Sequence, residues 1–271
     1  MTDEVSMART GLLDALDALE SHLDALVIVG AQAIYLHTGT TEIALAEFTT
    51  DGDVAIDPDL LSSDPLIEEA MRAAGFTPDP RSSAIGSWIS PRGVFVDLMV
   101  PEAVAGGAGR RGVRLPPHDS KAMRRSRGIE ATLVDNSKMV IRAIEVEKDA
   151  REFVVAVAGP AALLVAKLHK IHDRIDSPSR SDNKDAHDVY RLLRAVETPV
   201  LVDAITRLLR EAVSAEVTRD ALGQLRELFA RGAGARGSLM AGGAEELVGD
   251  PIAVSESVAL LAEDLLEALG S

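Results

Sequence analysis

The chain has 271 residues, a net charge of −15, no cysteine and only 3% aromatic residues. The lack of cysteine excludes disulfides, thiol catalysis and thiolate zinc sites, and it fits a reducing cytoplasm, where we expect the protein to reside. The acidic first residues are unlike a signal peptide, and no apolar stretch reaches the ~20 residues of a membrane span, so no membrane partner is expected.

Apolar periodicity and glycine or proline punctuation predict alternating helices and strands in the first part of the chain. In chain order these are a helix over 9–24, a strand over 26–29, a helix over 31–38, a strand over 53–56, a helix over 60–75, and strands over 86–90, 93–100, 139–144 and 153–157. After Gly159 the pattern predicts only helices, over 160–176, 183–196, 198–212, 216–231 and 253–269, with the glycine-rich runs 232–237 and 242–243 as flexible connectors.

This order of elements predicts an α+β fold in two domains. We expect a small mixed β-sheet domain with helices on one face over residues 1–158. A helical domain should follow over residues 159–271.

Two carboxylates alternate in the strand that follows the first glycine turn. The apolar run 26–29 ends in Gly30-Ala31, and some twenty residues later comes the run Thr50-Asp51-Gly52-Asp53. Side chains at i and i+2 of a strand share a face, so Asp51 and Asp53 should project together. A hard divalent cation such as Mg²⁺ relieves the repulsion of such a pair and is often shared with substrate phosphates. The layout indicates a nucleotidyl-transfer site.

A third aspartate, Asp97, lies in the middle of the apolar run 94–100. A carboxylate within a buried strand is costly unless it is paired or bound to a metal. Taken alone, Asp97 is as well explained by a satisfied core aspartate or by a strand edge that faces water. Beside Asp51 and Asp53, a shared metal site is the better explanation.

The glycine turn, the Thr-x-Asp-x-Asp strand and the later aspartate resemble the polymerase-β-type nucleotidyltransferase superfamily. A second block, which runs from Lys167-Leu168 through Arg174 to Lys184-Asp185-x-x-Asp188, resembles the signature of its AbiEii-type toxin branch. These are nucleotidyltransferase toxins of bacterial toxin–antitoxin and abortive-infection systems. The resemblance spans residues 25–195, with both blocks in the family's order.

The resemblance implies an enzyme that transfers NMP from an NTP to an acceptor hydroxyl, with the 3′ end of a tRNA as the best candidate and a cognate antitoxin as a partner. It implies that Mg²⁺ (or Mn²⁺) is held by Asp51, Asp53 and Asp97, and that Lys167 and Asp185 also serve catalysis. The residues implied to contact the nucleotide are Gly30, Ala31, Thr50, Lys167, Arg174 and Lys184. One departure is Ala31, because the family usually has glycine or serine there, and alanine offers no hydroxyl to the triphosphate.

Several alternatives stay open. Arg174 and Lys184 could form salt bridges with Asp185 and Asp188 that fix two helices, or simple surface ion pairs. The acceptor could be a protein or a small molecule. Ala31 also agrees with a degenerate, non-catalytic binding module.

The middle of the chain, residues 101–194, is the only part with a net positive charge. A glycine- and proline-punctuated stretch there carries Arg110, Arg111, Arg114, Lys121, Arg124, Arg125 and Arg127. Such a density of cations could grip the phosphates of an RNA end. A solvated loop, or an interface for an acidic partner such as an antitoxin, explains it equally well.

Overall fold

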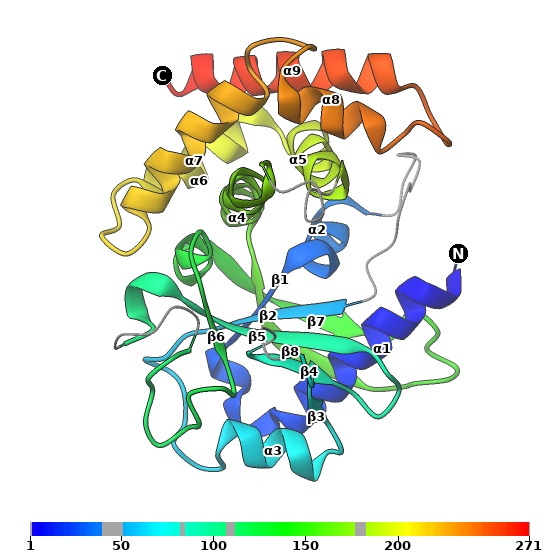
Figure 1. Ribbon diagram of the computed structural model, residues 1–271, viewed down its shortest axis with the longest axis vertical. Coiled ribbons are helices and arrows are strands. Elements are labelled where there is room, and N and C mark those ends of the chain that lie inside the picture. Colours follow the sequence, from blue (N-terminus) through cyan, green and yellow to red (C-terminus); the bar gives the residue numbers. More distant parts are fainter. Residues whose placement is uncertain (1, 40–50, 82–84, 107–111, 177–182, 271) are drawn as a thin grey trace. The chain divides into compact units, whose positions relative to one another are not determined.

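The computed structural model describes residues 2–39, 51–81, 85–106, 112–176 and 183–270, and the chain forms two compact units (Figure 1). Of these residues, the first unit takes those up to 33 and 51–158. The second takes 34–39, at the end of helix α2 (Gly30–Thr38), and everything from 159 on.

The described strands of the first unit form one eight-stranded mixed sheet. Its order is β3 (Thr77–Pro78), β4 (Ser87–Ile89), β5 (Phe95–Pro101), β2 (Asp51–Ile56), β1 (Leu26–Val29), β8 (Glu152–Ala158) and β7 (Asn136–Arg142), and β6 (Arg124–Ser126) also pairs with β5. Parallel pairs join β2 to β5, β5 to β6 and β1 to β8, and the other neighbours are antiparallel. The pairing of β2 with β5 is the one that positions the candidate site.

Helix α1 (Thr2–Ala18) covers one face of this sheet and packs on β2, β5 and β8. Its leucines at helical spacing, Leu12, Leu13 and Leu16, are fully buried. Gly11 lets the helix come close, because a Cβ there would lie 2.4 Å from Cγ1 of Val94. Helix α3 (Ile67–Ala73) packs beside α1, and short 3₁₀ turns complete the unit at η1 (Glu20–Ala25), η2 (Glu102–Val104) and η3 (Glu130–Leu133).

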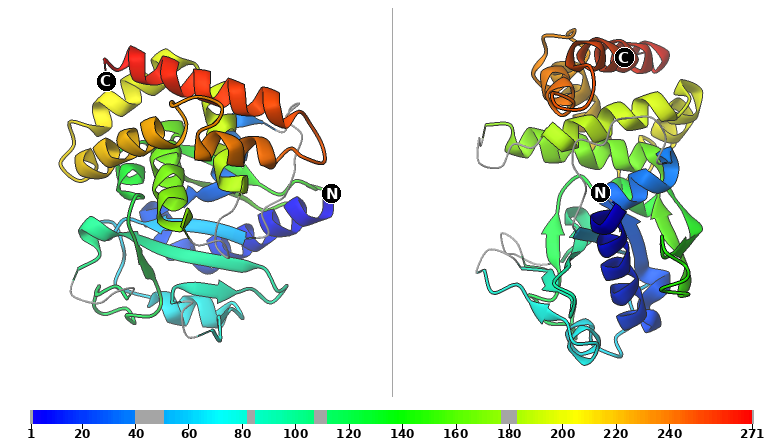
Figure 2. Two further views of the ribbon diagram at one scale, coloured as in Figure 1. Left: turned by 45° about the horizontal axis from the view of Figure 1, so that its top comes forward. Right: turned by 90° about the vertical axis from the view of Figure 1, so that its right-hand side faces the viewer.

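The second unit is helical. Beyond the end of α2 it consists of α4 (Pro160–Arg174), α5 (Asn183–Ala195), α6 (Thr198–Leu208), α7 (Ala215–Leu228), α8 (Arg236–Gly243) and α9 (Pro251–Ala268). Helices α8 and α9 lie side by side (Figure 2), and α5 packs on α4 and α8. Asp250 caps α9, since its carboxylate accepts hydrogen bonds from the amides of Ile252 and Ala253.

The predicted fold class, a mixed sheet with helices followed by a helical C-terminal part, is confirmed. Two element predictions are wrong. The helix predicted over 60–75 spans only Ile67–Ala73, because Pro65 cannot lie within a helix and disfavours helical backbone before it. The flexible connectors predicted at 232–237 and 242–243 are wrong in part, because Arg236–Gly243 form helix α8. None of the described helices has the length and apolarity to cross a bilayer.

Candidate active site

The three aspartates singled out in the sequence lie on one face of two paired strands. Strands β2 and β5 run parallel, and their register places Asp53 directly opposite Asp97 and Asp51 opposite Phe95. Because Asp51 and Asp53 are two residues apart, their side chains share a face, and the register puts Asp97 on that face as well. The predicted grouping of Asp51, Asp53 and Asp97 on adjacent strands is therefore what the backbone provides.

Burial alternates at the start of both strands, over residues 51–54 and 95–98, and beyond that point both faces are buried. The intervening residues Gly52, Val54 and Val96 are buried on the side of α1. The aspartates are only half-buried. The carboxylates thus occupy the face that α1 leaves uncovered, where an ion or a substrate could reach them.

Gly30 lies beside these aspartates, directly after the neighbouring strand β1. It follows β1, whose last residue Val29 pairs with Asp53, and it begins α2 with a φ of +67°. A Cβ at Gly30 would lie 2.1 Å from Oδ2 of Asp53, so the carboxylate rests against the glycine backbone. The position demands glycine on both counts. It also sets Asp53 at the N-terminus of a helix, where the helix dipole favours negative charge.

Asp97 has a basic partner. Nη2 of Arg124 donates a hydrogen bond to Oδ2 of Asp97 over 3.0 Å, and the Asp97 side chain is about one-quarter exposed. Arg124 begins β6, which pairs with β5 at Met99. Two residues earlier, the carbonyl of Ala122 accepts a hydrogen bond from the indole nitrogen of the buried Trp88. The pairing of β6 with β5 and the hydrogen bond between Ala122 and Trp88 thus fix the backbone that carries Arg124 beside Asp97.

A second arginine lies over the same face. The guanidinium of Arg81 stacks on the ring of Phe95, 5.3 Å from its centroid, and forms a close ion pair with Asp79. That ion pair, helped by the nearby charge of Asp97, raises the pKa of Arg81. Two arginines therefore offset part of the charge of the three aspartates.

These residues fit a hard cation in chemistry and placement, although not in their present side-chain conformations. The donors are all carboxylate oxygens, as Mg²⁺ prefers, and they share one face. Within the part of the chain that the structure describes, however, no three acidic or histidine side chains converge as a metal site. The hydrogen bond from Arg124 also engages one of the two Asp97 oxygens. A cation held by all three aspartates would therefore meet Asp97 with one oxygen occupied and a guanidinium beside it.

The second block of predicted residues forms a buried ion cluster in the second unit. Nζ of Lys167 lies 2.7 Å from Oδ1 of Asp185 and 2.6 Å from Oδ2 of Asp188, and all three side chains are at least nine-tenths buried. Lys170 and Arg174 reach Asp185 as well, over 2.9 and 3.8 Å. The cluster joins α4 to α5. This is the helix-fixing salt bridge foreseen as an alternative for Arg174, with Lys167 at its centre.

The charges of this cluster shift one another's titration. Burial alone would lower the pKa of Lys167, but Asp185 and Asp188 raise it well above its ordinary value. Burial alone would raise the pKa of Asp185, but Lys167 and Lys170 hold it well below its ordinary value. Lys167 is therefore a permanently charged ammonium bound by two carboxylates, and its predicted contact with nucleotide phosphates stays a prediction.

The remaining predicted residues lie in separate elements. Ala31 is buried in the first turn of α2, and Lys184 is half-buried in the first turn of α5. Thr50, Arg110 and Arg111 lie outside the described residues. Of the basic stretch, Arg125 and Arg127 both come within 3.9 Å of Glu102.

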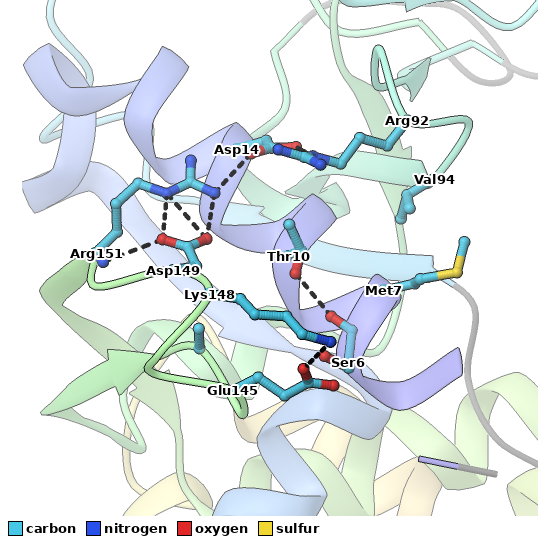
Figure 3. Close-up of a pocket in the computed structure, with 11 residues that line it drawn as sticks. Ser6, Met7, Thr10, Asp14, Arg92, Val94, Glu145, Lys148, Asp149 and Arg151 are labelled. Carbon is cyan, nitrogen blue, oxygen red and sulfur yellow. Dashed lines mark hydrogen bonds and ion pairs between the residues drawn. The ribbon is translucent and has the colours of Figure 1, made fainter. Parts of the chain in front are cut away.

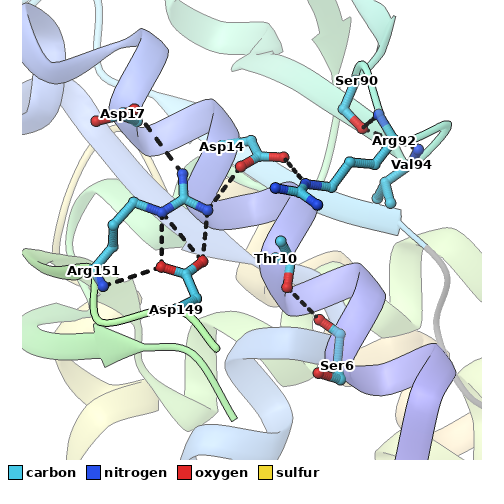
Figure 4. Close-up of polar contacts among 9 residues, drawn as sticks. All are labelled: Ser6, Thr10, Asp14, Asp17, Ser90, Arg92, Val94, Asp149 and Arg151. Atoms are coloured by element: carbon cyan, nitrogen blue, oxygen red, sulfur yellow. Dashed lines mark hydrogen bonds and ion pairs between the residues drawn. The ribbon is translucent and has the colours of Figure 1, made fainter. Parts of the chain in front are cut away.

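A separate cavity of about 400 Å³ lies between α1 and the turns at 90–94 and 143–151 (Figure 3). None of the three aspartates lines it. Asp14 bridges two of its arginines, 2.8 Å from Arg151 and 3.2 Å from Arg92, and Arg151 also binds Asp149 (Figure 4). Lys148 is paired with Glu145. The charges in this cavity hold α1 to the two turns.

Sequence reasoning did not find the pairing of Arg124 with Asp97. It placed Arg124 in a loop that could bind RNA, whereas the residue starts a short strand next to Asp97. No local signal identifies that strand, because Arg124, Arg125 and Ser126 lack the apolar alternation of a strand. The partner of Asp97 became visible only in three dimensions.

No known protein family and no curated protein matches the sequence. Among solved structures, an antigenic nucleotidyltransferase-like protein from Paracoccidioides brasiliensis is similar with a TM-score of 0.39 and 14% identity, over 81% of this chain and 93% of that chain. A protein described as a "putative nucleotidyltransferase" from H. pylori is similar with a TM-score of 0.33 and 10% identity, over 97% of this chain and 95% of that chain. Likenesses this low do not decide the fold or the function, so the case for an activity depends on the residues themselves.

Proposed function

We propose that the chain is a nucleotidyltransferase that moves NMP from an NTP to an acceptor hydroxyl. The observation that carries the proposal is the register of β2 and β5, with Asp53 opposite Asp97 and Asp51 on the same face. Burial of the opposite face explains why apolar residues alternate with these positions, but it does not explain three carboxylates on the open face. A shared cation does.

Each residue of the site has a role in this proposal. Asp51 and Asp53 would hold Mg²⁺, or Mn²⁺ in its place, and Asp97 would complete the set. When bound, the metal supplies positive charge that stabilises the attacking and leaving oxygens of an in-line displacement. The backbone amides at the start of α2, from Gly30 and Ala31, offer hydrogen bonds to the triphosphate.

The proposed transfer balances as follows. The oxygen of the acceptor hydroxyl forms a bond to the α-phosphorus, and the bond from that phosphorus to the β-phosphate oxygen breaks. Pyrophosphate leaves with its electron pair. Asp97, half-buried on the open face, takes the proton of the hydroxyl.

The first test is incorporation of label from α-³²P-NTPs, each NTP tested separately. Asp51→Asn and Asp53→Asn should each reduce transfer by about 100-fold or more, because each removes a carboxylate that stabilises the transferred charge. Asp59→Asn is the matched control, since it makes the same chemical change at an exposed residue just beyond β2 and should leave the rate unchanged. Transfer that persists in both site variants would refute the assignment.

The acceptor and the biological role are finer proposals. By the resemblance set out above, the acceptor is the 3′ end of a tRNA, the biological role is that of a toxin, and a cognate antitoxin opposes it. The nucleotide would then be contacted by Lys167, Arg174 and Lys184. Catalysis would also depend on Lys167 and Asp185. Separating the labelled product into RNA, protein and small-molecule fractions identifies the acceptor. Growth arrest on expression in bacteria, relieved by Asp53→Ala, tests the toxin role.

A non-catalytic binding module is the second candidate, and two observations favour it. Ala31 offers no hydroxyl, and Asp97 is engaged by Arg124. Calorimetry with Mg²⁺ and each NTP separates the two candidates. Metal-dependent nucleotide binding that is lost in Asp53→Asn supports the enzyme, and its absence supports the module.

A further inference from the structure

Arg124 and the proposed metal compete for the same carboxylate. Asp97 lies opposite Asp53 in the register, so it is the natural third ligand beside the Asp51–Asp53 pair. Yet Oδ2 of Asp97 accepts a hydrogen bond from Arg124. The bonded oxygen is occupied, and the positive guanidinium repels a cation that approaches the other oxygen. Arg124 therefore competes with a cation for the carboxylate of Asp97.

The backbone of Arg124 is fixed on several sides, so its side chain is the part that can move. Its residue pairs with Met99 of β5 and forms a bridge to Gly112. The backbone of Arg124 also packs closely against Gly86, because a Cβ at Gly86 would lie 2.4 Å from the amide nitrogen of Arg124. The Arg124 side chain is about one-third exposed and reaches the open face from this fixed base.

We propose that Arg124 regulates the metal site by engaging the carboxylate of Asp97, and that an anionic ligand releases it. The inference rests on the proposed function, since it needs a cation at these aspartates. A phosphate that takes over the guanidinium leaves Asp97 free to turn to the cation. The nucleotide and the metal thus assist each other's binding, and the cation alone binds more weakly than three released carboxylates would allow.

The test is binding of Mn²⁺ alone to the full chain, measured as the loss of the free-ion signal in electron paramagnetic resonance. Arg124→Gln should tighten Mn²⁺ binding by about 2- to 5-fold, the range expected when one partly exposed ion pair is removed as a competitor. Arg124→Lys keeps the charge but loses the forked donor, and should lie between Arg124→Gln and the unaltered chain.

Arg127→Gln is the control for charge alone. Arg127 is three residues further along, its side chain is 42% exposed, and it lies within 3.9 Å of Glu102. This variant should change Mn²⁺ affinity little. Thermal melting checks that each variant is folded, and Arg124→Lys carries the test if Arg124→Gln does not fold.

The outcomes separate the two proposals. If Mn²⁺ binds and Asp53→Asn abolishes it, but Arg124→Gln and Arg124→Lys bind no tighter than Arg127→Gln, the competition is wrong and the metal site stands. If no variant shows binding that depends on Asp53, the metal site itself is wrong, and the competition falls with it.

Discussion

At the scale of single residues, Gly30 is the tightest position of the candidate site. Its φ of +67° and the absence of a side chain allow the carboxylate of Asp53 to rest on the backbone. An alanine there would adopt a strained conformation and push on Asp53 at the same time. The glycine therefore sets both the turn and the place of an acidic group.

We predict that Gly30→Ala lowers the free energy of unfolding by about 1–2 kcal/mol, the cost of left-handed backbone for a residue with a Cβ. It should also weaken Mn²⁺ binding and transfer by more than this loss of stability explains, because the methyl group displaces Asp53. Chemical denaturation and the binding assay measure the two effects.

Gly52→Ala is the matched control. Gly52 lies between Asp51 and Asp53, but a Cβ there would point toward α1 and meet Leu12 and Val96 only at 3.6 Å, an ordinary contact. Its effect on metal binding should be small. Equal losses in Gly30→Ala and Gly52→Ala would mean that the contact with Asp53 has no special role.

At the scale of elements, α8 shows how glycine can favour a helix through packing. A Cβ on Gly242 would lie 2.2 Å from Oγ of Ser255 and 2.3 Å from the carbonyl oxygen of Pro251, both in α9. A Cβ on Gly237 would meet the carbonyl oxygen of Leu228 at 2.7 Å. The low helix propensity of glycine is offset by the close approach that it permits.

Gly242→Ala should therefore destabilise the second unit by about 1–3 kcal/mol, the usual cost of overpacking, despite the better helix propensity of alanine. Gly223→Ala in α7 makes the same change where nothing lies within 4 Å of the new Cβ. There the substitution should stabilise by about 0.5–1 kcal/mol. Opposite signs in thermal melting are expected, and a stabilising Gly242→Ala would contradict the packing argument.

Periodicity predicted most elements because they bury one face. The helix pattern of α1 and the apolar runs of β1, β2 and β5 needed no tertiary information to be recognised. It failed where packing outweighed local preference, at the glycines of α8, and where a strand is polar and short, at β6. It also failed at the start of α3, where Pro65 is the relevant signal.

The candidate site was predictable in part for the same reason. Spacing alone places Asp51 and Asp53 on one face of a strand. The register that sets Asp97 opposite Asp53 joins segments more than 40 residues apart, so no local pattern contains it. The contact of Arg124 with Asp97 depends on a further long-range pairing, of β6 with β5.

At the scale of the whole molecule, the two units respond to acid differently. The first contains His22, which is 2% exposed. Burial lowers the pKa of His22 below its ordinary value of 6.5, and the neighbouring His118 lowers it further, although a backbone contact with Pro65 opposes them. The second unit contains Asp185, whose pKa lies below its ordinary value of 3.8.

The directions of these pKa shifts predict which unit loses stability first as the pH falls. The unfolded chain binds a proton at His22 more readily than the folded chain, so the first unit loses stability as the pH falls below 6.5. Asp185 contributes stability above its unfolded pKa of 3.8, and that contribution is lost only as the pH falls from there through the folded pKa. Acid should therefore loosen the first unit before it affects the ion cluster of the second.

Hydrogen exchange of the full chain, read by mass spectrometry and corrected for the intrinsic effect of pH, resolves peptides of both units. Between pH 6.5 and 3.8, protection should fall in β1 and its neighbours while α4 and α5 keep theirs. His22→Gln should make the hydrogen-exchange protection of the first unit depend less on pH. A simultaneous loss in both units would show that His22 does not govern the acid response.

The single tryptophan of the chain, Trp88, is anchored to Ala122, two residues before Arg124, and its neighbour Ser87 lies opposite Asp97 in the sheet. Any displacement of the Arg124 segment changes the surroundings of that indole. Trp88 itself lies opposite Val96, so its indole is on the other face of the sheet from Asp97 and is linked to the site through the backbone. Its emission therefore offers a dye-free test of whether the proposed binding of Mn²⁺ shifts the backbone at Arg124 or moves only its side chain.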